Sequence, residues 1–284
     1  MRIKKSKDRN EYINADGIWV RNFNNKGVPH IDINKMFSEK EYQKLLKNEI
    51  SNRSRNLQNI DEEEIWFNKI IIVSDGYDFE NKSKMLRKIP QDVAVIATNG
   101  ALAKWNLHLG EDPKPINLYI VNNPYSECTK YLPSLTRYYP VCVSSIRTCP
   151  EFLDNYHGQA YFYEPSQQKD FGSPYSAKYH IDDYRNPICA AIGIAAQFKT
   201  KKLMLFCCDD SFENERSAAE KLPNGLWTYP QQLKSQKIID ANLFWYKQRE
   251  DVEIADHSSC AEYSNAQYIE KETEIISFFE DTQE

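Results

Sequence analysis

The stretch KIIIVSD at residues 69–75 decides the fold class, because its run of four apolar residues leaves no polar face that a strand could turn to water. Similar apolar runs occur in VAVIATNG (93–100) and KLMLFCCDD (202–210). Strands that are apolar on both faces are typical of parallel sheets covered by helices on each side. We therefore expect an α/β protein with a Rossmann-like, mainly parallel sheet and helices on both faces.

Working outward from this stretch, short β-branched runs alternate with helical stretches. This alternation is the signature of βαβ units and predicts at least six strands. The expected strands are 69–75, 93–100, 116–123, 140–146, 160–165 and 202–210, with a further short strand at 252–256. The expected helices are a polar one to about residue 87, one through 105, and others near 150–156, 187–198 and 231–247.

The chain divides into three regions. Residues 1–66 form a polar extension, in which Ser38 caps a helix that runs to about Leu57. Residues 67–256 form the Rossmann-like domain, and residues 257–284 carry an acidic C-terminal helix around positions 268–279.

Composition excludes several classes of protein. The 36 Lys and Arg against 41 Asp and Glu give a net charge of −5, so no positive field favours nucleic acid as a partner. Ile188 to Phe198 is only about half the ~20 residues of a membrane span. The 7 cysteines form no C-x-x-C pair, which favours a reduced, cytoplasmic protein. We assign no oligomeric state from the sequence.

Polar residues gather where the expected strands end. In a parallel sheet these ends share one edge, and ligands bind there. Single loops of this kind are common as turns and helix caps, so only their coincidence favours a polar ligand site. The endings that we assign to substrate or nucleotide binding contain Ser74, Gly76, Tyr77, Asn99, Gly100, Asn122, Asn123, Ser144, Ser145 and Arg147.

Neither G-x-G-x-x-G nor G-x-x-x-x-G-K-[ST] is present, which disfavours nicotinamide dehydrogenases and P-loop kinases. Another phosphate site is expected at Asn186-Pro187, a strong helix start with free N–H groups, beside Arg185. The alternative is that Arg185 pairs with Asp182 or Asp183 at the surface.

The order of these motifs resembles a known family. IIIVSDGYDFE, ATNGAL, VNNPYSE, SSIRTCPEFL, FYEP and NPICAAIGIAAQFKTKKLMLFCCDDS are similar to the corresponding segments of the MptE-like family, related to 6-hydroxymethylpterin diphosphokinase. The resemblance spans roughly residues 67–250. It implies a nucleotide-binding transferase that moves a pyrophosphoryl group to a small-molecule acceptor. Bacterial sialyltransferases and motility-associated glycosyltransferases have a similar pattern and fold.

The resemblance implies a Mg²⁺ ion and a nucleoside triphosphate as co-substrate. Asp209 and Asp210 would hold the metal, with Asp75 and Asp210 in catalytic roles. The structural alternative is that at least one of Asp209 and Asp210 is a helix cap. Asn122 and Asn123 replace the aspartates usual in the family, and neutral amides are poor Mg²⁺ ligands. Two alternatives therefore stay open, a glycosyltransferase that uses a nucleotide sugar and a non-catalytic ligand-binding or interaction protein.

Two further features have both a functional and a structural interpretation. His180, in a long polar loop, is a candidate general base next to Asp182 and Asp183, although such a histidine is more often a surface residue. A set of tyrosines is expected to pack on the sheet, with one or two able to stack on a base. These are Tyr131, Tyr138, Tyr139, Tyr161 and Tyr163.

Overall fold

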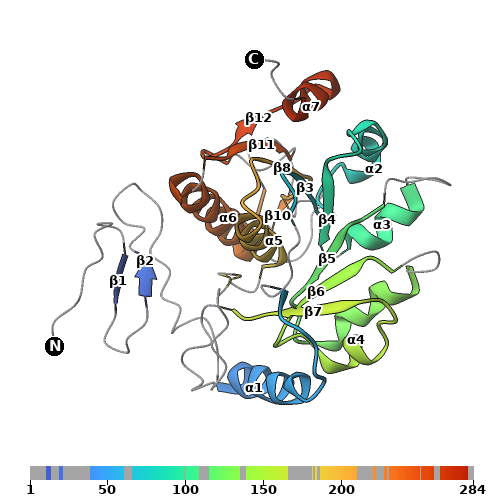
Figure 1. Ribbon diagram of the computed structural model, residues 1–284, viewed down its shortest axis with the longest axis vertical. Coiled ribbons are helices and arrows are strands. Elements are labelled where there is room, and N and C mark those ends of the chain that lie inside the picture. Colours follow the sequence, from blue (N-terminus) through green and yellow to red (C-terminus); the bar gives the residue numbers. More distant parts are fainter. Residues whose placement is uncertain are drawn as a thin grey trace.

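The computed structural model shows an α/β protein built on one large sheet (Figure 1). It describes residues 11–13, 19–21, 39–60, 66–98, 100–108, 115–134, 139–165, 181, 183, 186–209, 220–221, 227–228, 230–249, 251–258 and 263–280. The strands, helices and contacts described below all lie within these residues.

The sheet has eight strands in the order β12-β11-β8-β3-β4-β5-β6-β7, and each neighbouring pair is parallel. This confirms the predicted Rossmann-like sheet. The strands are β3 (Lys69–Val73), β4 (Ala94–Thr98), β5 (Leu118–Val121), β6 (Val141–Ser145), β7 (Ala160–Tyr163), β8 (Lys202–Phe206), β11 (Glu253–His257) and β12 (Gln267–Tyr268). Two small antiparallel pairs lie outside it, β1 (Glu11–Ile13) with β2 (Trp19–Arg21) and β9 (Glu220–Lys221) with β10 (Trp227–Thr228).

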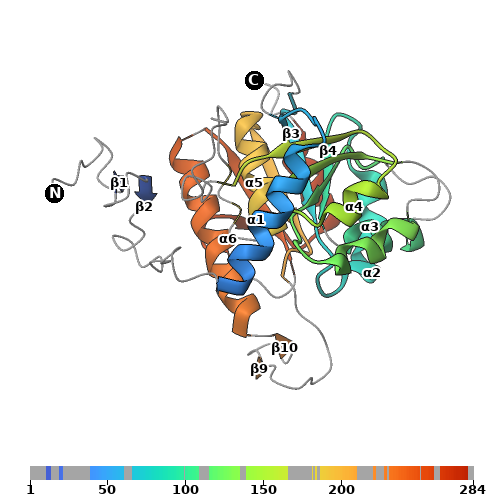
Figure 2. The ribbon, with the colours of Figure 1, turned by 90° about the horizontal axis from the view of Figure 1, so that it is seen from below.

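Helices cover both faces of the sheet (Figures 1 and 2). One face packs against α5 (Pro187–Gln197) and α6 (Pro230–Arg249). The other face packs against α2 (Phe79–Lys82), the 3₁₀ helix η4 (Ser83–Lys88), α3 (Ala101–His108), the 3₁₀ helix η5 (Ser126–Ser134), α4 (Pro150–Asp154) and α7 (Glu272–Phe279). We call these the α5 face and the α3 face.

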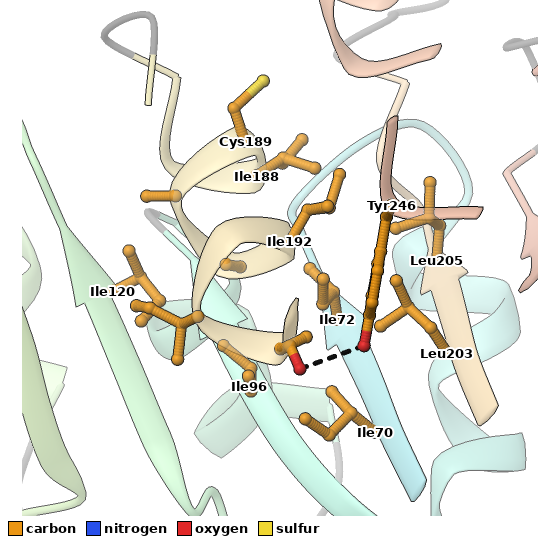
Figure 3. Packing of buried hydrophobic residues seen from close by; sticks show 14 of the residues in the cluster. Ile70, Ile72, Ile96, Ile120, Ile188, Cys189, Ile192, Leu203, Leu205 and Tyr246 are labelled. Atoms are coloured by element: carbon orange, nitrogen blue, oxygen red, sulfur yellow. Dashed lines mark hydrogen bonds between the residues drawn. The ribbon is translucent and has the colours of Figure 1, made fainter. Parts of the chain in front are cut away.

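The central strands β3, β4 and β8 are apolar on both sides because each side meets a helix layer. Ile70 and Ile72 point to the α5 face, whereas Ile71 and Val73 point to the α3 face. Figure 3 shows α5 lying on the first pair, with the Tyr246 hydroxyl of α6 hydrogen-bonded to the Ala195 carbonyl at 3.0 Å. Small side chains along α5 allow this close approach of helix to sheet.

Helix α1 (Glu39–Arg53) comes from the N-terminal extension and covers the carboxyl ends of β5, β6 and β7. The buried Asn48 amide donates to Pro124 O (2.9 Å) and Arg147 O (3.1 Å). The Asn52 amide likewise donates to Ile146 O (2.9 Å) and Thr148 O (2.8 Å). These four bonds hold α1 against the loops that follow β5 and β6.

Three predicted elements differ from the structure. Helix α1 ends at Arg53 and not near residue 57, because the backbone is left-handed at Asn56 (φ 54°). The polar helix after β3 is a short α2 followed by a 3₁₀ helix. The C-terminal helix begins at Glu272, since the preceding residues 267–268 form the edge strand β12 beside β11.

The six cysteines of the described part are buried and free, so none forms a disulfide there. Within the same part of the chain, no helix combines the length and the hydropathy that crossing a membrane requires.

Candidate functional site

The strand order of the sheet reverses between β3 and β8. From β3 the chain adds β4 to β7 on one side, and it then adds β8, β11 and β12 on the other side. Ligands of open α/β sheets bind at such a reversal, at the carboxyl ends of the strands. Here the two strand ends are tightly joined. The Gly76 N–H donates to Cys207 O at 2.9 Å, and a Cβ at Gly76 would lie 2.2 Å from Asp209 Oδ1. Only glycine fits this turn.

A charged site lies on the α3 face, at the ends of β3 and β4. It consists of Asp75, Lys104, Lys130 and Tyr131. Gly100 brings the backbone against the carboxylate, because a Cβ there would lie 2.1 Å from Asp75 Oδ2. The Lys104 ammonium donates to Asp75 O at 3.0 Å. Lys130 Nζ lies 4.9 Å from the centre of the Tyr131 ring.

Burial raises the pKa of the Asp75 carboxyl above its usual value, and the charges of Lys104 and Lys130 partly oppose this shift. Burial also raises the pKa of the Tyr131 hydroxyl, and the Asp75 charge adds to that rise. A half-buried carboxylate with a raised pKa is a better proton acceptor than an ordinary carboxylate in water. The flanking ammonium groups suit an anionic ligand.

A second polar group lies on the α5 face. We call Asn122, Ser145 and Tyr163 the polar seam. Strand register pairs Val121 with Ser144, and Ser145 with Tyr163, so the three residues lie side by side at the carboxyl ends of β5, β6 and β7. All three are buried. The predicted site residues therefore fall on two faces of the sheet and do not form a single cluster.

The N-terminus of α5 corrects one prediction. The Asn186 side chain accepts from Ile188 N (2.8 Å) and Cys189 N (3.4 Å), and residue 187 is a proline without an N–H. The Asn186 N–H itself donates to Asp183 O. The helix start thus exposes no free N–H groups, contrary to expectation, because the asparagine that begins the helix also caps it. Phosphate contact by Asn186 stays a prediction that needs its side chain to turn away.

Arg147 is also placed differently from the prediction. Its side chain is only 3% exposed and lies beneath α1, with Nε 3.4 Å from Glu49 Oε2. The guanidinium is thus engaged inside the protein and is not offered to a ligand. Ser144 is buried with its hydroxyl on Ser145 O, and the half-buried Asn123 uses Oδ1 to hold Tyr125 N.

Asp209 is fully buried, and its Oδ1 accepts the backbone N–H of Tyr77 at 3.0 Å. This bond holds the turn that carries Asp75 and resembles the capping role given as the alternative to metal binding. Among the described residues, no three His, Cys, Asp or Glu side chains are grouped so as to hold a metal ion. The described residues alone therefore do not form a Mg²⁺ site. The predicted Mg²⁺ site at Asp209 and Asp210 now depends on Asp210, which lies outside the described residues.

Next to Asp209, Asp256 at the end of β11 is also buried. Its pKa is raised to about 7, mainly by burial; two hydrogen bonds from Ser258 oppose this rise, and the Asp209 charge adds to it. The Ser258 hydroxyl donates to Asp256 Oδ1 (2.6 Å) and accepts from Cys208 N (2.9 Å). The ends of β8 and β11 are thus joined through a carboxylate that is easily protonated.

Several predicted residues lie outside the described residues. They are Asn99, His180, Asp182, Arg185 and Asp210. Their assigned roles therefore stay predictions.

Sequence reasoning missed Lys104, Lys130, Glu49 and Asp256. One signal for Lys104 was available, because a lysine in the first turn of a helix opposes the helix dipole and needs another reason to be there. Glu49 and Asp256 gave no such signal, since their burial depends on contacts between distant segments of the chain.

Comparison with known proteins adds a fold likeness. No family model matches the chain, and no curated protein matches it either. Among solved structures, the MAf glycosyltransferase from Magnetospirillum magneticum AMB-1 is similar, with a TM-score of 0.60 and 13% sequence identity. The match covers 81% of this chain and 38% of the glycosyltransferase chain, so this chain spans less than half of that protein. At this identity the likeness establishes the fold alone.

Proposed function

We propose that this chain is a transferase that uses a nucleotide-linked donor, and that the donor is a nucleotide sugar. The observation that carries the proposal is the Asp75 carboxylate at the carboxyl edge of the sheet, with a pKa raised by burial and with Lys104 and Lys130 beside it. The similarity in fold to a glycosyltransferase supports the choice of a sugar donor.

In this proposal Asp75 acts as the general base. It accepts the proton of an acceptor hydroxyl while that oxygen forms a bond to the anomeric carbon of the sugar. The bond between the anomeric carbon and the phosphate oxygen breaks, and its electron pair leaves with the nucleotide. Lys104 and Lys130 stabilise the negative charge that develops on the departing phosphate.

Turnover of donor tests this proposal. We expect the protein to release nucleotide from one member of a panel of UDP-, GDP- and CMP-linked sugars, with and without Mg²⁺. Asp75→Asn keeps the shape of the side chain but removes the base, and should lower kcat by a factor of about 10² or more. Lys104→Met should weaken donor binding, since a charge-assisted contact is lost.

The exposed Lys84 of η4 provides a matched control, because Lys84→Met removes the same charge on the neighbouring helix. It should leave both kcat and donor affinity unchanged. Binding of a nucleotide without turnover would favour a ligand-binding protein. Turnover of ATP with a pterin acceptor would favour the diphosphokinase, which rests on sequence resemblance only. Either result would overturn the sugar-donor proposal.

A further inference from the structure

The charged site contains one group to which the proposed reaction gives no role, the Tyr131 hydroxyl. Tyr131 lies in η5, which packs against α3, the helix that carries Lys104. The side chains of Tyr131 and Asp75 are both half-buried, so part of each stays accessible to solvent. They lie close enough together for the Asp75 charge to act on the phenol. Tyr131 therefore belongs to the same site, on the same face of the sheet.

The Tyr131 hydroxyl is a hydrogen-bond donor at neutral pH. Burial and the charge of Asp75 raise the pKa of the phenol, so it keeps its proton there. The Lys130 ammonium, 4.9 Å from the centre of the Tyr131 ring, partly opposes this rise. No hydrogen bond joins the phenol to the Asp75 carboxylate in the described part of the chain. The site thus presents a donor and an acceptor that face each other without bonding to each other.

Neighbouring contacts hold Asp75 and its cation in place. A Cβ at Gly100 would lie 2.1 Å from Asp75 Oδ2, so the backbone at the start of α3 packs against the carboxylate. The Lys104 ammonium donates to Asp75 O at 3.0 Å and lies 5.8 Å from the centre of the buried Phe79 ring. The base is therefore fixed in position before a substrate binds, as electrostatic catalysis requires.

Hydrogen-bonding capacity decides which group fits between Tyr131 and Asp75. A phosphate oxygen would be repelled by the carboxylate, and an ammonium group has no lone pair with which to accept from the phenol. A hydroxyl group can both accept from Tyr131 and donate to Asp75. The acceptor of the proposed transfer carries such a hydroxyl, whereas the phosphates of the donor are attracted by Lys104 and Lys130.

We propose that Tyr131 positions the acceptor hydroxyl, its phenol donating to the acceptor oxygen while that oxygen donates to Asp75. One lone pair of the oxygen accepts the hydrogen bond, and the other forms the bond to the anomeric carbon. The O–H bond of the acceptor then breaks and its proton passes to Asp75, while Tyr131 keeps its own proton throughout. This inference rests on the proposed function, because it assigns the acceptor side of the same reaction.

Hydrolysis of the donor tests this role, since water then takes the place of the acceptor hydroxyl. The probes are UDP-, GDP- and CMP-linked sugars for turnover, and UDP, GDP and CMP for binding. We expect Tyr131→Phe to lower kcat for donor hydrolysis about tenfold, the effect of one lost hydrogen bond, and to leave nucleotide affinity unchanged. Lys130→Met should instead weaken nucleotide binding, because a charge-assisted contact is lost.

Tyr125 supplies the control, since it directly precedes η5 and is 38% exposed. Tyr125→Phe removes the same hydroxyl and should leave kcat and nucleotide affinity unchanged. The thermal midpoint of Tyr131→Phe should match that of the wild type, because the ring beside Lys130 is retained. An unchanged kcat in Tyr131→Phe, or an equal loss of kcat and nucleotide affinity, would overturn this role and leave the proposed function standing. A wild-type protein that releases no nucleotide from any of these donors would overturn both.

Discussion

At the β5–β7 end of the carboxyl edge, charged side chains are paired with one another, whereas the β3–β8–β11 end holds the half-buried Asp75 and the two neighbouring buried carboxylates Asp209 and Asp256. In the first region Glu49 of α1 accepts from Arg53 (2.9 Å) and Arg147 (3.4 Å), and Arg53 also reaches Glu164 (3.1 Å). In the second region, Asp75 and Asp256 both have raised pKa values.

The difference teaches which charges build the fold and which are available for chemistry. A paired and hydrogen-bonded ion contributes to the fixed position of α1 but is poorly placed to exchange a proton. A carboxylate with a raised pKa is held in a less favourable state, and such groups concentrate at functional sites. We therefore place the proposed catalytic residues at the β3–β4 end and assign α1 a structural role.

The largest effect is expected from breaking the paired region. Glu49→Ala removes the carboxylate that faces Arg147, which is only 3% exposed. Removing one partner of a buried ion pair costs about 3–5 kcal/mol, so the free energy of unfolding in urea should fall by that amount. Glu151→Ala, at an exposed position of α4, should change it by less than about 0.5 kcal/mol. Equal effects of the two variants would mean that the network does not hold α1.

A smaller effect, dependent on pH, is expected from Asp256→Asn. The folded protein holds the proton of Asp256 up to a pKa of about 7, whereas the unfolded chain releases it near pH 4. Between these values the folded state binds more protons, so this carboxyl makes the protein less stable as pH rises. The amide keeps Oδ1 for Ser258 but has no charge to bury.

Urea unfolding at several pH values measures this effect. Asp256→Asn should match the wild type near pH 4 and exceed its free energy of unfolding at pH 8 by about 2 kcal/mol or more. A difference that stays the same at every pH would show that the carboxyl does not titrate in this range.

Periodicity and strand runs were sufficient to predict the sheet, because patterns such as the one at 69–75 report local burial directly. The positions of the seven main strands were predicted to within a few residues at each end. Helix α1 was predicted as an element, but its place on the carboxyl edge was not. That place depends on Asn48 and Asn52 reaching carbonyls far along the chain, and no local pattern encodes such contacts.

The candidate site was predicted only in part for a similar reason. Asp75, Gly76 and Gly100 follow their strands directly, so strand ends alone identified them. The division between two faces could not be predicted without the register of β5, β6 and β7. Arg147 follows a strand equally directly and was assigned to the ligand, because sequence does not reveal that α1 covers it.

The smallest change in stability is expected from substitutions at Asp209. They distinguish a carboxylate that positions the Asp75 turn from one that binds a metal ion. Asp209→Asn retains an oxygen that can accept the Tyr77 N–H, so the free energy of unfolding should change by less than about 1 kcal/mol, whereas Asp209→Ala should lose about 1–3 kcal/mol. The amide also removes a charge that raises the pKa of Asp256. The pH dependence of stability should therefore shift to lower pH in Asp209→Asn.

Because a neutral amide is a poor Mg²⁺ ligand, titration of Mg²⁺ into the nucleotide complex gives the decisive comparison. Equal Mg²⁺ dependence in the wild type and in Asp209→Asn supports a carboxylate that positions the Asp75 turn, and a lost dependence would restore Asp209 as a metal ligand.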